Sequence, residues 1–281
     1  MSSRHSRPGD QAGQSRTFAW LIAPLGVLYG VFAVLPLGMI LRFSVANGFE
    51  NFRNIFGSPL LLRVATNTLV ISLATTIIAL ALAIPVAAVL WRSGPKLRSL
   101  IMAFVLLPFW TAVLIKNLAW AVLLQDNGVV NGLLQAAGVG PFTLLHNRLA
   151  VLIGMVHFVL PYAIFPIYTA MREIDLRLEN AARSMGAGTA EVIWHVILPL
   201  IMPGIAAAAL LVFIVSTGFF ITPAILGSPS DMMISNLVDY YVHELINFNN
   251  AAALAVLVAL LLAPVIVLQQ RVGKRGQYGV G

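Results

Sequence analysis

Six long stretches of apolar residues constrain the fold of this chain more than any other feature of its sequence. A helix that crosses the hydrocarbon core of a bilayer needs about 20 mostly apolar residues. The stretches that meet this length are residues 18–41, 67–91, 99–124, 149–171, 200–226 and 251–270. None of them alternates apolar and polar residues as the strands of a membrane β-barrel do. The sequence therefore predicts an all-α membrane protein with six transmembrane helices.

The composition agrees with this class and limits the number of domains. Charged residues make up 10% of the 281 residues and hydrophobic residues 59%, whereas a soluble domain has about 25% charged residues. The length suffices for one membrane domain but not for a sizeable soluble domain beside it. We expect a cytoplasmic tail at 1–17, a transmembrane domain at 18–270 and a second cytoplasmic tail at 271–281. The apolar run after the first tail is too long for a signal peptide.

The positions of the basic residues predict the orientation of the chain in the membrane. Loops on the cytoplasmic side carry an excess of Lys and Arg. Twelve of the 17 basic residues lie on one side of the predicted membrane and four on the other. The side with twelve holds both termini, the turn at 92–98 and the segment 172–199, which we therefore place in the cytoplasm. The net charge of +7 is thus a topology signal and does not indicate binding to nucleic acid.

Several kinds of chemistry are excluded by what the sequence lacks. It has no cysteine, which excludes disulfides, cysteine-based zinc sites and thiol catalysis. It has no G-x-x-x-x-G-K-[ST] phosphate-binding loop and no metalloprotease or nucleophile-elbow motif. Its five histidines show no metal-ligand spacing. We therefore expect no catalytic residue, no metal site and no cofactor bound by this chain, and any ATP must be hydrolysed by another polypeptide.

The segment 172–199 interrupts the apolar pattern with a polar, turning stretch. Residues 176–185 are good helix formers, and Gly186 stands where a left-handed cap ends such a helix. Thr189 is placed to cap a second helix, with Glu191 in its first turn. We expect that second helix to end at Pro199, where the fifth apolar stretch begins. A charged helix–turn–helix between two spans is a surface for a partner, and insertion of a helix into a groove is the expected mode.

This segment resembles the coupling loop of permease subunits in binding-protein-dependent ABC importers. The family pattern is Glu-Ala-Ala, three residues, Gly, nine residues, then Ile-x-Leu-Pro. The chain departs from it at Asn180, where the family usually has Glu, although Glu179 is one residue earlier. The resemblance implies a coupling helix between transmembrane helices 4 and 5 that seats in a cleft of the ATPase. The candidate coupling residues are Glu179, Asn180, Ala181, Ala182, Arg183, Gly186, Ala187, Leu198 and Pro199.

Further stretches are similar to the spermidine/putrescine-type permeases, and to the first of their two permease subunits. They are residues 107–134, 160–175 and 218–238, with a weaker match at 67–72. The resemblance implies an ABC importer permease in a bacterial inner membrane that works with a second permease subunit, two ATPase subunits that use ATP and a soluble substrate-binding protein. It implies a polyamine or a related small organic solute as substrate. The alternative, a self-sufficient channel or secondary transporter, predicts intramembrane carboxylates for ion coupling, and the six stretches contain none.

Four residues are candidates for the pathway or its outer mouth: Lys116, Trp110, Asp231 and Asp239. Lys116 lies about 25 Å into the third stretch if that helix is straight, near the outer interface. There it either reaches up to the headgroups or lines the outer mouth. The last external loop carries three acidic residues and no basic one. It is either a solvated loop or a docking site for the binding protein. The sequence does not specify the substrate.

Overall fold

The computed structural model describes the backbone of residues 9–277 and the side chains of Pro24 and of residues 26–270. All regular structure within this range is helical, as predicted. The side chains of the two predicted tails, 1–17 and 271–281, lie outside the described residues, as do those of residues 18–23 and 25 in the predicted first span. The basic residues that we counted at the two termini therefore also lie outside them.

Five helices are long and apolar enough to cross a membrane, and a bent pair supplies a sixth span if it is counted as one. The five are α1 (Gly9–Ser44), α3 (Pro59–Arg92), α7 (Arg148–Arg172), α10 (Leu198–Thr217) and α13 (Phe248–Gln277). The bent pair begins with α4 (Pro95–Trp110) and α5 (Val113–Leu124). The shorter helices are α2 (Glu50–Phe56), α6 (Val129–Ala136), α8 (Leu176–Ser184), α9 (Thr189–Val192), α11 (Ile221–Leu226) and α12 (Ile234–His243). The six predicted stretches thus correspond to these spans.

Two of the predicted stretches are not single straight helices. The third breaks at Thr111 and Ala112, whose backbones are extended, and the chain bends there by 99°. Pro108 prepares this break, because a proline lacks the N–H that a continuous helix needs. The fifth stretch ends as α10 at Thr217, and α11 is separate from it. Gly218 caps α10, consistent with the low helix propensity of glycine.

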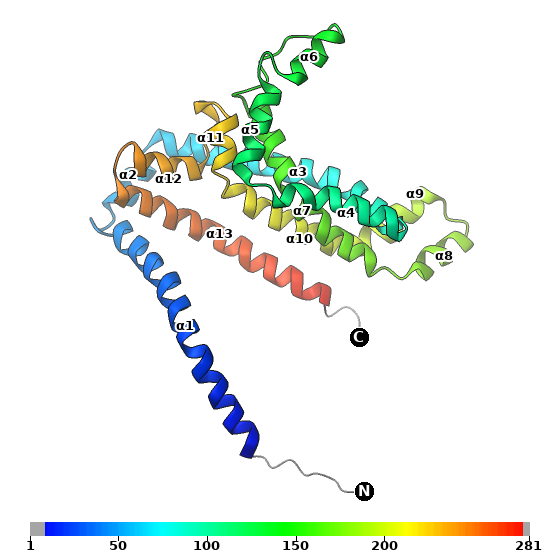
Figure 1. Cartoon of the computed structure of the whole chain (residues 1–281), viewed down its shortest axis with the longest axis horizontal. Helices are drawn as coiled ribbons and strands as arrows, with labels where there is room; N and C mark the ends of the chain where they lie inside the picture. The colour runs from blue at the N-terminus through cyan, green and yellow to red at the C-terminus, as the bar shows by residue number, and fades with distance from the viewer. Residues whose placement is uncertain (1–8, 278–281) are drawn as a thin grey trace.

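The core of the bundle lies where α3, α7 and α10 pack against one another (Figure 1). Alanines on α3 and α10 let the helices approach closely, as small residues do in membrane proteins. The fully buried residues at this contact include Ala79, Ala83, Ala87, Ala163, Ile164, Ile167, Ala208 and Val212. The approach is closest at Gly204, where an added Cβ would lie 2.5 Å from the Cβ of Ala170.

The bundle has two distinct ends, and two parts of the chain leave it. Helices α8 and α9 lie together at one end, and α2, α11 and α12 lie at the other (Figure 1). Helices α5 and α6 project from the side of the bundle (Figure 1). Helix α1 packs against α13 but diverges from the bundle along its length, and apolar side chains such as Phe32 are exposed on it.

Candidate functional site

The turn after α8 is built by backbone geometry around one glycine. Gly186 has φ +91°, so the predicted left-handed cap is confirmed. Its N–H donates to the carbonyl of Arg183 at 3.0 Å, and the N–H of Ala187 donates to the carbonyl of Ala182 at 3.1 Å. This pair of bonds is the Schellman motif, which satisfies the last carbonyls of a helix. A Cβ at Gly186 would meet nothing within 4 Å, so the conformation, and not the space, requires glycine.

The second helix begins one residue earlier than predicted. Gly188 is the N-cap of α9 and Thr189 is its first residue, so the expected cap by Thr189 is wrong. Gly188 has no side chain to cap the helix, and Glu191 makes only the other bond of a capping box, from inside the first turn. Its Oε2 accepts the N–H of Gly188 at 2.8 Å.

The second helix also continues past the point where we expected it to end. It passes through a π-helical turn at Ile193–Ile197 and runs directly into α10. Pro199 lacks an N–H and its ring crowds the carbonyl four residues earlier. The helix adapts by one wider turn, in which the N–H of Leu198 bonds to the carbonyl of Ile193. A displacement of α9 is therefore transmitted to α10 along a continuous helix.

Glu179 connects α8 to the end of α3. Its Oε1 lies 3.3 Å from Nη2 of Arg92 and 2.9 Å from Nη2 of Arg183. The Glu179 side chain is 14% exposed, whereas Asn180 beside it is exposed to solvent. The acidic residue one position before the family's usual Glu thus faces inward and fixes the helix in place.

The other face of the α8–α9 segment is apolar and uncovered. Ala182 and Val192 pack into the core of the bundle. On the outer side, the side chains of Met185, Trp194 and Ile193 are 83%, 66% and 44% exposed. Exposed apolar groups next to charged ones are typical of a surface that a partner covers.

Lys116 is half-buried and lies over an aromatic ring of α7. Its Nζ is 4.6 Å from the centroid of the Phe158 ring. Phe158 is ten residues along α7 from Arg148, about 15 Å at 1.5 Å per residue, which is about half of the hydrocarbon thickness. Lys116 thus lies beside the middle of α7. The straight helix on which the estimate of about 25 Å depended bends at Thr111, and the position of Lys116 at the outer mouth stays a prediction.

An aromatic stripe follows one side of α7. Phe158, Tyr162 and Phe165 are spaced four and three residues apart, so they share a helix face, and all three are half-buried. The Phe219 ring meets Phe158 edge-on at 4.7 Å, and the Phe109 ring lies 5.8 Å from Tyr162. We did not predict this stripe. The spacing of the three aromatic residues, four and three apart, was the feature of the sequence from which it could have been predicted.

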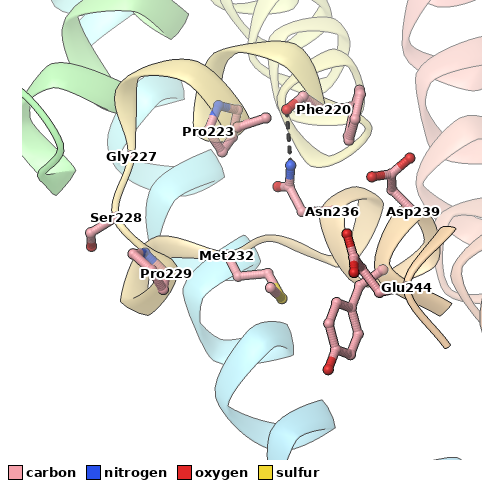
Figure 2. A pocket seen from close by; sticks show the side chains of 11 residues that line it. Phe220, Pro223, Gly227, Ser228, Pro229, Met232, Asn236, Asp239 and Glu244 are labelled. Carbon is pink, nitrogen blue, oxygen red and sulfur yellow. Dashed lines mark hydrogen bonds between the residues drawn. The ribbon is translucent and has the colours of Figure 1, made fainter.

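A pocket of about 340 Å³ lies at the opposite end from α8. Aromatic rings from Phe220 and Tyr240 and the carboxylates of Asp239 and Glu244 line it (Figure 2). Asp239 also pairs with His243 on the next turn of α12, at 2.8 Å. This pocket contains one of the four residues that we proposed for the pathway or its mouth.

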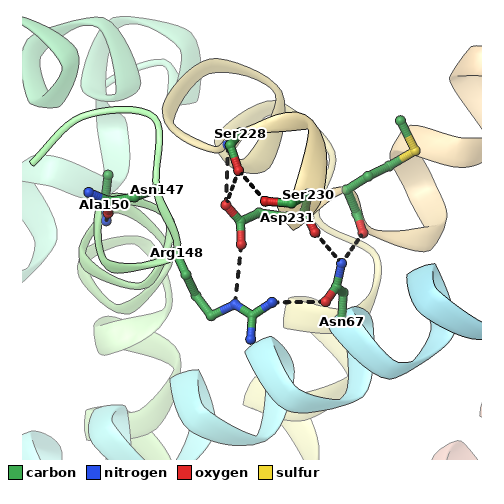
Figure 3. Close-up of polar contacts among 8 residues, drawn as sticks. Asn67, Asn147, Arg148, Ala150, Ser228, Ser230 and Asp231 are labelled. Carbon is green, nitrogen blue, oxygen red and sulfur yellow. Dashed lines mark hydrogen bonds and ion pairs between the residues drawn. The ribbon is translucent and has the colours of Figure 1, made fainter. Parts of the chain in front are cut away.

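Asp231 lies instead in a buried polar network beside that pocket (Figure 3). Its side chain is 6% exposed, and its Oδ1 lies 3.2 Å from Nε of Arg148. Nη2 of Arg148 also donates to Oδ1 of Asn67 at 2.9 Å, and Asn67 donates to the backbone carbonyls of Ser230 and Met232. The network joins the third turn of α3 and the first turn of α7 to the loop after α11.

The four candidate pathway residues thus lie in different parts of the molecule. Lys116 lies over the Phe158 ring of α7, Asp239 lines the pocket and Asp231 belongs to the network with Arg148. Trp110 ends α4 with 85% of its side chain exposed. Within the described residues no group of three His, Cys, Asp or Glu side chains is close enough to hold a metal ion.

Comparison with known families accounts for most of the chain. Residues 67–276 match the family model described as "Binding-protein-dependent transport system inner membrane component". The chain is 36% identical over 256 residues to the spermidine/putrescine transport system permease protein PotB of Haemophilus influenzae, covering 87% of this chain and 88% of that protein. It is 28% identical over 218 residues to PotB of Escherichia coli, covering 77% and 79%.

A solved structure shares the fold. The chain superposes with a TM-score of 0.80 on a bacterial alginate ABC transporter, which was crystallised with an alginate pentasaccharide-bound periplasmic protein. The match covers 96% of this chain and 98% of the other at 19% sequence identity. This chain therefore belongs to the binding-protein-dependent inner membrane component family, and it is a multi-pass permease component of an ABC importer, not a catalytic subunit.

Proposed function

We propose that this chain forms half of the translocation pathway of an importer for spermidine, putrescine or a related organic amine. One observation carries the coupling part of this proposal. The α8–α9 segment places Gly186, with φ +91°, at the glycine of the coupling motif and exposes the surface around it. Movement of an ATPase seated there passes through α9 into α10, since no loop intervenes.

The substrate class is supported by the relatives and by the side chains at mid-membrane. Spermidine/putrescine permeases are among the relatives that match over most of their length, and one of them is 36% identical to this chain. The half-buried stripe on α7 consists of aromatic rings, and ring faces attract organic cations. A stripe that carries a lysine and a histidine beside its rings is suited to water or a protein partner, and not to lipid.

The proposed assembly contains this chain, a second permease subunit, two ATPase subunits and a soluble substrate-binding protein. Both termini and the α8–α9 segment face the cytoplasm, and the pocket beside α12 faces the binding protein. The proposed coupling residues remain Glu179 to Arg183, Gly186, Ala187, Leu198 and Pro199. Of these, Glu179 acts by holding α8 against Arg92 of α3 and not by contact with the ATPase. Uncovered apolar residues on α1, such as Tyr29 and Phe32, provide a surface for the second permease and for lipid.

The test is uptake by the reassembled importer. The chain is expressed with its cognate permease partner, ATPase and binding protein in a host that lacks polyamine importers, and uptake of labelled spermidine and putrescine is measured. We expect ATP-dependent uptake with the wild-type chain. Gly186→Val should insert and accumulate but lose both uptake and co-purification of the ATPase. Uptake by the chain without an ATPase would instead support a secondary transporter or a channel.

A further inference from the structure

We propose that Lys116 is a tethered competitor of the substrate, whose ammonium group occupies an aromatic site that an ammonium group of the transported amine uses during passage. The site is the face of the Phe158 ring, at mid-membrane on α7. The inference rests on the proposed function, because it names a step in the passage of the same amine.

Lys116 has no charged partner among the described side chains. Among the side chains that are described, no carboxylate lies within 4.0 Å of its Nζ and no acceptor takes a hydrogen bond from it. Its ammonium group is 4.6 Å from the centroid of Phe158, within the range of about 6 Å in which a ring face attracts a cation. Since a charge at this depth is costly without a partner, the ring face is a working cation site.

The ring face is held in place by neighbours other than Lys116. Phe219 meets the Phe158 ring edge-on, with centroids 4.7 Å apart and planes at 69°. Tyr162 stacks on it from the next turn of α7, with centroids 5.9 Å apart. Removal of the lysine charge therefore leaves an oriented ring with a vacant face.

The nearby histidine does not compete for the ring face. Nε1 of Trp120 donates to Nδ1 of His157 at 3.1 Å. An indole nitrogen can only donate, so this Nδ1 carries no proton and the imidazole is neutral. Lys116 is thus the cation of this cluster, and it bears the same primary ammonium group as each end of putrescine.

The strength of this interaction suits a step in transport. A cation–π contact is worth about 0.5–2 kcal/mol, which is about 2- to 30-fold in affinity. A site of this strength holds an amine briefly and releases it. The lysine already at the ring weakens the binding of the transported amine further, because the entering ammonium group must displace that of Lys116.

The test compares amine binding to the purified importer complex without its binding protein. Labelled putrescine is the probe, and unlabelled butylammonium and uncharged 1,4-butanediol are the competitors. Lys116→Met should bind putrescine about 2- to 30-fold more tightly than wild type, and only butylammonium should displace it. The double variant Lys116→Met with Phe158→Leu should lose the gain. Lys96→Met, which removes an exposed charge at the start of α4, should bind as wild type does.

A chemical rescue shows whether the tethered charge itself is responsible. Because the chain has no cysteine, the thiol of Lys116→Cys is the one group of this chain that the reagents modify. The wild-type complex, treated in the same way, controls for reaction at cysteines of the partner subunits. Aminoethyl methanethiosulfonate attaches an ammonium group and should reverse the gain in binding. Methyl methanethiosulfonate attaches a neutral group and should not.

The outcomes separate this inference from the proposed function. Equal putrescine binding by wild type and Lys116→Met, with both complexes intact by size-exclusion chromatography, overturns the inference even when the importer takes up amines. A gain that Phe158→Leu does not remove also overturns it. If the importer takes up no amine, the proposed substrate is wrong, and binding of butylammonium still decides whether Lys116 blocks a cation site.

Discussion

The two ends of the helix bundle are held together in different ways. At the α8 end, the turn depends on bonds between near neighbours, such as the one from Ala187 to Ala182. At the α12 end, the loop is fixed by Arg148, whose partner Asp231 is 83 residues away in sequence. The first end exposes apolar and charged side chains around a locally built turn. The second end buries the side chain of Asp231 in a network of three helical elements.

This difference indicates what each end does during transport. A turn that holds its own shape can move as a unit with the helices on which it packs when a partner pulls on it, because its bonds are local and its ion pair with α3 is partly exposed. A loop tied to Asn67 of α3 and to the first turn of α7 cannot move without these two helices. We therefore expect the α8 end to act as the mobile handle and the α12 end as a fixed rim.

The proposed roles of the two ends require that they face opposite sides of the membrane. Cysteines placed singly at Gly94, before α4, and at Ser230, beside Asp231, test this in a chain without native cysteines. Both positions are exposed. In intact spheroplasts, an impermeant maleimide should label only the Ser230 variant, and the Gly94 variant should react only after lysis. The reverse pattern would invalidate the topology and the coupling argument together.

The largest effect on stability is expected at the rim. Arg148→Met leaves the carboxylate of Asp231 buried without its cation, although Ser228 still donates to it. Loss of the partner of a buried charge should cost about 2–3 kcal/mol. We expect a lower midpoint of thermal unfolding for the purified chain.

The matched control for this variant is Arg63→Met, which removes an exposed arginine from the first turns of α3. It should leave the midpoint within the error of wild type. Equal losses in the two variants would mean that net charge, and not the network, stabilises this end.

The same difference explains what could be predicted from the sequence. The left-handed turn at Gly186 was predictable because its determinants lie within a few residues. The six spans were predictable because hydropathy is also a local property. The pairing of Arg148 with Asp231 depends on how α7 and the loop after α11 meet, and no local pattern encodes that. The straight helix assumed for the depth of Lys116 was wrong for a related reason, since the bend at Thr111 redirects the residues after it.

An intermediate effect is expected at the handle, where two neighbouring glycines form a matched pair. Gly186 has φ +91° and Gly188 has φ −70°, and neither has a neighbour that would clash with a Cβ. Gly186→Ala should cost about 1 kcal/mol, because an L-residue is strained in the left-handed region. Gly188→Ala should cost less, about 0.5 kcal/mol, because it loses only the preference for glycine over alanine at an N-cap. Retention of the ATPase on purification should fall in the first variant and persist in the second. Equal retention would exclude a role for this turn in coupling.

The smallest effect is expected where the handle touches the bundle through charge alone. Glu179→Gln weakens the pairs with Arg92 and Arg183, whose side chains are 51% and 38% exposed. Pairs of this kind contribute about 0.5–1 kcal/mol and are screened by salt. The loss in unfolding midpoint should therefore be small at low ionic strength and should vanish at high ionic strength. Glu173→Gln, an exposed carboxylate without an ion pair among the described side chains, should show no loss. Because Glu179 faces α3 and not the exposed surface, the ATPase should remain bound to the Gln variant. Loss of the ATPase with an unchanged midpoint would show instead that Glu179 contacts the ATPase directly, and that α8 is not fixed to α3 during coupling.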